Sequence, residues 1–168
     1  MPDLFVHFAS GYLVAPKLGL QGRREAVFVV GALLPDFLAR IPIVVLDEFF
    51  QLNTLWFFLS FHTPAALLVS CYFLAMLFPQ AQRRDYFGWL FSGALLHQCL
   101  DLMQGQFHEG TYMLFFPFSF KTTELRLFHN DAGIYLFPLL MMAVVWSHRQ
   151  RKRLSHFNQE RWENDIDR

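Results

Sequence analysis

The chain has 168 residues, enough for one domain with its own core, and its 14 basic and 14 acidic residues leave no net charge. Apolar residues make up 54% of the chain and charged residues only 17%, whereas a typical soluble domain carries about 25% charged residues. This balance argues against a nucleic-acid-binding protein with a basic surface, and it favours a membrane protein.

The first two apolar segments are both unusual for membrane helices. Residues 4–15 are apolar but too short to span a bilayer, which takes about 20 residues, so we expect a short helix that lies at the interface or inserts partway. Residues 26–46 are long enough to span, but they contain Pro35, Asp36 and Arg40. A proline and charges at this depth predict a kinked helix beside a cavity rather than beside lipid.

Three further apolar segments complete the expected bundle. Residues 54–78 carry no formal charge, and they predict the clearest span. Residues 86–103 and 132–147 predict two more. We therefore expect an all-α, polytopic membrane bundle with about four transmembrane helices plus the short N-terminal helix. The membrane-embedded domain is placed at residues 1–147, and a charged cytoplasmic tail at residues 148–168.

The basic residues predict how the chain is oriented in the membrane. They cluster at residues 17–24, 83–84 and 148–153, which are alternate connections between the expected helices. Cytoplasmic connections of membrane proteins carry an excess of Lys and Arg. Placing all three clusters on the cytoplasmic side leaves the acidic connection at residues 47–53 outside. The pattern thus predicts a multi-pass protein with a cytoplasmic C-terminus.

Polar side chains lie deep within several of these segments. At about 1.5 Å per residue, Asp36 lies roughly 15 Å and His97 roughly 16 Å from the cytoplasmic end, and His62 roughly 12 Å from the outer end. Asp101 follows His97 by one turn, on the same helix face. His7 joins this group if the N-terminal helix enters from the outer side. Because such groups are costly in a membrane, we expect them to meet and to serve a function.

Together these residues form a plausible set of metal ligands. Three imidazoles and two carboxylates suit Zn²⁺, with Mn²⁺ as the alternative, or a pair of divalent ions. A divalent cation keeps a buried carboxylate ionised and activates water at neutral pH. We predict that the metal is held by His7, His62, His97 and Asp101, and that Asp36 is either a fifth ligand or the general base.

Each member of the set also has a simpler interpretation. A single intramembrane histidine such as His62 often only bonds a neighbouring helix. Asp36 either caps a broken helix or pairs with Arg40, four residues later on the same face. His97 and Asp101 can form a hydrogen bond without any metal. The metal interpretation therefore depends on five groups at similar depth, rather than on any one of them.

Four motifs in shared order resemble a known family: GALLPDF at 31–37, SFHTP at 60–64, GALLHQCLD at 93–101 and GTYMLFFPFS at 110–119. They are similar to motifs of the inner-membrane, LexA-regulated proteins described as metal-dependent hydrolases. In that family an N-terminal histidine, an LPD motif, a THS-type histidine and an HxxxD helix recur. The opening MPDLFVH is also similar to the zinc-dependent phospholipase C-like proteins.

All five predicted ligands stand at positions that match the family pattern. The resemblance also implies that the protein lies in the inner membrane. Two departures stand out. Leu38 stands where the family often has a second acid, and residues 57–59 are apolar where it often has HRG. Both remove polar groups from the predicted site, which favours one metal ion over two.

Hydrolysis of an ester or phosphoester in a lipid or lipid-linked substrate is the function we expect, because lipids reach this depth more easily than soluble metabolites. The expected partners are thus the membrane and its lipids, and not nucleic acid. The main alternative is a small transporter or ion-conducting or proton-conducting protein that uses the intramembrane His and Asp residues. A structural membrane subunit and a very hydrophobic soluble bundle are further alternatives.

Overall fold

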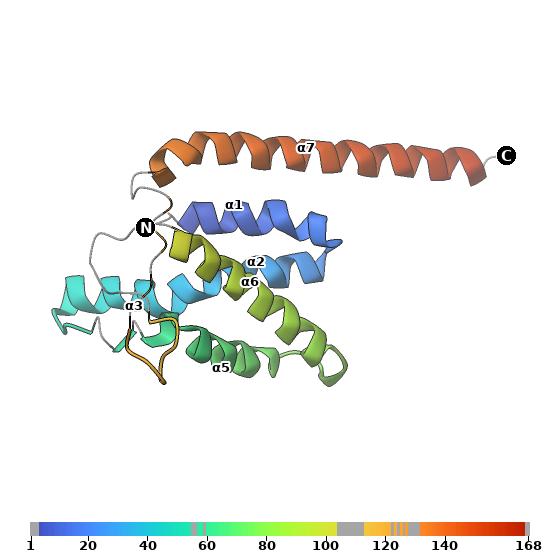
Figure 1. Ribbon diagram of the computed structural model, residues 1–168. Helices are drawn as coiled ribbons and strands as arrows, with labels where there is room; N and C mark the ends of the chain where they lie inside the picture. Colours follow the sequence, from blue (N-terminus) through green and yellow to red (C-terminus); the bar gives the residue numbers. More distant parts are fainter. Residues whose placement is uncertain are drawn as a thin grey trace.

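The computed structural model describes residues 4–54, 57–58, 60–103, 113–121, 123, 125, 127 and 132–166, and all regular structure in this part is helical. The all-α class is thereby confirmed. The longer helices pack into a bundle, and the longest of them lies along its edge (Figure 1). The bundle helices are α1 (Leu4–Val14), α2 (Arg23–Pro35), α5 (Pro64–Ala75) and α6 (Arg83–Met103), and the long helix is α7 (Ala132–Ile166). Each packs on its neighbour in the order α7, α1, α2, α6 and α5.

Helix α2 continues beyond Pro35 without a break. It runs through the π-helical segment η2 (Asp36–Arg40), the single turn α3 (Ile41–Ile43) and a second π-helical segment, η3 (Val44–Phe49). Proline lacks a backbone N–H and cannot complete the α-helical ladder, which accounts for wider turns near Pro35. The proline therefore lies within a continuous helical run, and the expected kink at this position stays a prediction. The run Arg23–Phe49 is the one described segment that is long and apolar enough to cross a membrane.

The prediction of one continuous span at residues 54–78 was wrong. The chain forms a short 3₁₀ turn, η4 (Ser60–His62), and α5 begins only at Pro64 and has just 12 residues. Thr63 has an extended backbone, and its hydroxyl accepts a hydrogen bond from the Ala66 N–H at 3.4 Å. A capping threonine followed by proline starts a new helix and cannot continue an earlier one.

The C-terminal part also differs from a simple span and tail. Residues 132–147 and most of the expected tail form one continuous helix, α7, of 35 residues. Most of the connection at residues 104–131, including the start of the GTYMLFFPFS motif, lies outside the described residues. With one clear span candidate among the described helices, the arrangement of about four spans stays a prediction.

Two glycines allow α2 and α6 to cross at backbone contact. A Cβ atom on Gly31 would lie 2.2 Å from the Leu90 carbonyl oxygen, and one on Gly93 would lie 2.1 Å from the Phe28 carbonyl oxygen. No side chain larger than hydrogen fits such a contact without moving the helices. A core that includes Leu90 and Ala94 surrounds this crossing. Close contact of these two helices is what brings their polar residues together further along.

The three basic clusters gather at one end of the bundle. The α1–α2 turn and the α5–α6 turn lie on the same side in Figure 1. Arg24 after the first turn pairs with Asp85 after the second at 2.8 Å. From α7, Arg151 pairs with Glu25 and donates to the Tyr12 carbonyl oxygen at 3.0 Å. The predicted site residues lie near the helix ends at the opposite end of the bundle from these basic clusters.

Candidate metal centre

The structure brings all five predicted site residues into one buried cluster. His7 lies on α1, Asp36 begins η2, His62 ends η4, and His97 and Asp101 lie one turn apart on α6. The exposed fractions of these residues range from 0% to 9%. In Figure 1 the start of α1, the end of α2 and the end of α6 converge at the same side of the bundle.

Asp101 is the centre of the cluster. Its Oδ2 atom lies 2.9 Å from His62 Nε2 and 3.0 Å from His97 Nε2. Its Oδ1 atom lies 3.2 Å from His7 Nε2. One carboxylate therefore faces three imidazole nitrogens that come from three different helical elements. This is the convergence that the sequence pattern predicts, and it depends on close packing of α1, η4 and α6.

The hydrogen bonds of His97 favour a metal over a simple bond to Asp101. His97 Nδ1 donates to the Ala32 carbonyl oxygen at 2.8 Å, so the neutral ring has a lone pair on Nε2. That lone pair faces Asp101 Oδ2, and it also lies 3.3 Å from His62 Nε2. A hydrogen bond to Asp101 would instead require an additional proton, either on the fully buried ring or on the carboxyl group. A cation among these atoms would offset the repulsion between their lone pairs, so this set of ligand atoms fits a metal ion.

Asp36 lies at the edge of the cluster. Its Oδ1 atom is 3.9 Å from His97 Nε2 and 4.0 Å from Arg40 Nη1. Its Oδ2 atom is buried and has no hydrogen-bond partner among the described residues. Asp36 has helical dihedral angles inside a continuous helical run, so it does not cap a broken helix. The simpler interpretation that Asp36 pairs with Arg40 holds, although the 4.0 Å separation of their atoms is long for an ion pair.

Two groups of ligand atoms meet the distance requirement for a shared ion. One comprises His7, His97 and Asp101, and the other comprises Asp36, His62 and His97; within each group the atoms lie within 4.8 Å of one another. Two carboxylates and one nearby arginine leave the cluster negative when the imidazoles are neutral, which attracts a divalent cation. Ligation of metal by these five residues stays a prediction, with Zn²⁺ and Mn²⁺ as the candidate ions.

Two contacts that support the cluster were missed at the level of sequence. The His7 ring stacks on the His97 ring, with centroids 3.6 Å apart. Gln98, only 2% exposed, donates from Nε2 to the His62 carbonyl oxygen at 3.0 Å. An amide beside His97 in an apolar helix is a signal of such a role, because a buried polar side chain needs a partner.

Replacing Gln98 by Leu is expected to weaken the site through His62. The substitution removes the bond to a buried carbonyl oxygen, which costs about 1–3 kcal/mol, and loss of a supporting contact typically lowers metal affinity about 10-fold to 100-fold. Denaturation midpoints and metal titration measure the two effects. Gln80→Leu, an exposed position at the basic end, is the matched control. Unchanged metal affinity in Gln98→Leu would show that the amide does not position His62.

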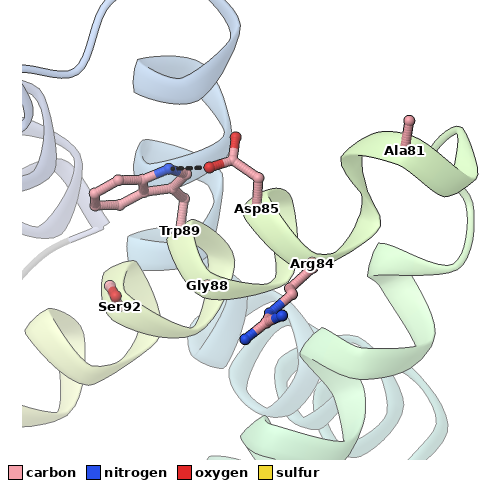
Figure 2. Close-up of a pocket in the computed structure, with 6 residues that line it drawn as sticks. All are labelled: Ala81, Arg84, Asp85, Gly88, Trp89 and Ser92. Atoms are coloured by element: carbon pink, nitrogen blue, oxygen red, sulfur yellow. Dashed lines mark hydrogen bonds between the residues drawn. The ribbon is translucent and has the colours of Figure 1, made fainter.

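A pocket lies near the basic end of α6, and its lining residues are separate from the cluster (Figure 2). Beside it, Trp89 Nε1 donates to Asp85 Oδ1, one turn earlier on the same helix, at 3.2 Å (Figure 2). The lining residues of the pocket are Ala81, Arg84, Asp85, Gly88, Trp89 and Ser92. None of the predicted site residues lines this pocket.

The helical bundle and its buried His/Asp cluster define an all-α protein with a candidate metal centre. Residues 3–158 match the family described as YdjM inner membrane protein, a LexA-regulated family to which metal-dependent hydrolase activity has been ascribed. The chain belongs to this inner-membrane family, and the resemblance seen in its motifs is confirmed. No curated protein and no solved structure matches the chain.

Proposed function

We propose that this protein is a membrane-bound, metal-dependent hydrolase that cleaves an ester or phosphoester bond of a lipid or lipid-linked substrate. The observation that carries the proposal is the convergence of three imidazole nitrogens on the buried Asp101 carboxylate. Buried ionisable groups in membrane proteins are costly and usually mark functional sites. The description of the family as metal-dependent hydrolases supports the same conclusion.

The distances suggest a division of roles among the five residues. His7, His62, His97 and Asp101 would hold the ion, because their atoms approach one another most closely. The chemistry that a divalent cation supplies is activation of water and polarisation of the ester or phosphoryl oxygen. Asp36 lies further out and its Oδ2 atom has no described partner, so it would take the proton from the attacking water.

The ends of the bundle suggest how lipid reaches the site. With the basic end on the cytoplasmic side, the cluster lies in the outer half of the membrane and the C-terminus is cytoplasmic. Beside the cluster, the segment from η2 to η3 exposes apolar side chains, among them Phe37, Ile41 and Val44. A lipid in the outer leaflet would contact this surface directly. An arrangement of about four spans is part of the same proposal.

Metal content is the first test of this function. We expect the full-length protein, purified in detergent, to contain about one Zn²⁺ or Mn²⁺ per chain. A His97→Ala variant should lose this metal, because His97 belongs to both groups of ligand atoms. Elemental analysis measures the loss. His148→Ala, which changes a histidine on α7 at the basic end, is the matched control and should retain the metal. Metal retained by His97→Ala would exclude the proposed centre.

Turnover distinguishes a hydrolase from a transporter. Purified protein in mixed phospholipid vesicles is expected to release a water-soluble or acyl product from the lipid. Addition of a chelator is expected to abolish this release. Absence of chelator-sensitive product on all lipid classes, together with metal flux into protein-containing vesicles, would instead support transport.

A further inference from the structure

Arg40 links the buried cluster to the surface of the protein. Its Nη1 atom lies 4.0 Å from Asp36 Oδ1, and its side chain is 40% exposed. The five cluster residues are themselves buried. Among the described ion pairs, this is the one in which a permanently charged group reaches the cluster.

The surroundings of Arg40 are apolar. Phe37, Ile41 and Val44 flank it along the helical run, with exposed fractions of 49%, 41% and 50%. A guanidinium group on a lipid-facing surface is costly unless it is paired. A separation of 4.0 Å is too long for a hydrogen bond to Asp36, and the described residues make no other hydrogen bond to this side chain. Its donors are therefore available to a ligand.

Resting on the proposed function, we infer that Arg40 binds the phosphate group of a lipid, and that the substrate is a phosphate-bearing lipid rather than a neutral ester. Guanidinium groups bind phosphate with two parallel hydrogen bonds, which a carboxylic ester does not accept as strongly. Arg40 follows Asp36 by one helical turn in the direction away from the basic end. Its long side chain can stay in the apolar region while its head reaches a lipid headgroup.

The simpler role for Arg40 is to form an ion pair with Asp36. The two roles differ in what they predict about lipid selectivity. An arginine that only supports Asp36 affects all lipids equally. An arginine that binds phosphate affects phosphate-bearing lipids and leaves neutral lipids unchanged. Lipid binding therefore separates the roles without depending on activity.

The test measures lipid retained by full-length protein in detergent, after metal removal, by native mass spectrometry. The probe is an equimolar mixture of phosphatidylglycerol and diacylglycerol with the same acyl chains. We expect wild type to prefer phosphatidylglycerol, Arg40→Gln to lower that preference roughly tenfold, and Arg40→Lys to retain part of it. Arg24→Gln is the matched control, since Arg24 is exposed at the opposite end. Melting temperatures check that the variants are folded.

Two results would overturn the inference. One is an unchanged lipid ratio in Arg40→Gln and Arg40→Lys, or an equal loss of both lipids. The other is displacement of phosphatidylglycerol by inorganic phosphate at comparable concentration, which would indicate a soluble phosphate ligand. Because the measurement uses metal-free protein, a chain that binds no metal but shows the selective loss contradicts only the hydrolase proposal. A metal-containing, active chain without the selective loss contradicts only the role of Arg40.

Discussion

Replacing Asp101 by Asn is expected to abolish metal binding while the helical fold remains. The carboxylate faces the Nε2 atoms of His7, His62 and His97 at 2.9–3.2 Å. Asparagine has nearly the same shape but no charge, so the substitution removes the central anion and leaves the packing in place. In wild type, a bound metal would stabilise the folded state by about 4 kcal/mol when the free ion is at 1,000 times its dissociation constant.

Thermal melting with and without a chelator measures this effect. We expect the melting temperature of wild type to fall when the chelator is added, and that of Asp101→Asn to stay the same. Asp85→Asn is the matched control, because Asp85 lies on the same helix but pairs with Arg24 at the other end. It should keep the wild-type response. An Asp101→Asn variant that still responds to the chelator and contains metal would show that the ion binds elsewhere.

Replacing Gly93 by Val is expected to disrupt both the fold and the site. The added Cβ would lie 2.1 Å from the Phe28 carbonyl oxygen and 2.8 Å from the Ala32 nitrogen, so α2 and α6 must separate. Overpacking typically costs about 1–3 kcal/mol, and we expect the upper end here because the clash is with backbone. Separation of the helices also breaks the bond between His97 and the Ala32 carbonyl oxygen.

Gly88→Ala on the same helix is the control for the glycine prediction. A Cβ atom on Gly88 meets no atom within 4 Å, and alanine stabilises a helix interior by about 0.5–1 kcal/mol relative to glycine. We therefore expect the denaturation midpoint to fall in Gly93→Val and to rise slightly in Gly88→Ala. Metal content should fall in Gly93→Val and stay at the wild-type level in Gly88→Ala. A Gly93→Val variant with wild-type stability and metal content would contradict the close crossing of α2 and α6.

Several features followed from the sequence because they depend on local chemistry. The short apolar stretch at residues 4–15 forms α1, Leu4–Val14, ending just before Pro16. The four-residue spacing of His97 and Asp101 puts both on one face of α6. The order of four short motifs predicted the family, and the family match over residues 3–158 confirms it. Composition alone was misleading at residues 54–78, where Thr63 and Pro64 begin a new helix inside an apolar run.

The remaining features were decided by tertiary structure. Helical spacing determines which residues share a face, but not which helices meet or how closely. Here Gly31 and Gly93 let α2 and α6 touch backbone to backbone, and that contact brings Asp36 within reach of His97. The bond from Gln98 to the His62 carbonyl oxygen joins α6 to η4, which is a second contact between separate elements. The sequence thus determined which polar groups are present and to which family the chain belongs. The packing of α1, η2, η4 and α6 against one another determined that these groups form one site.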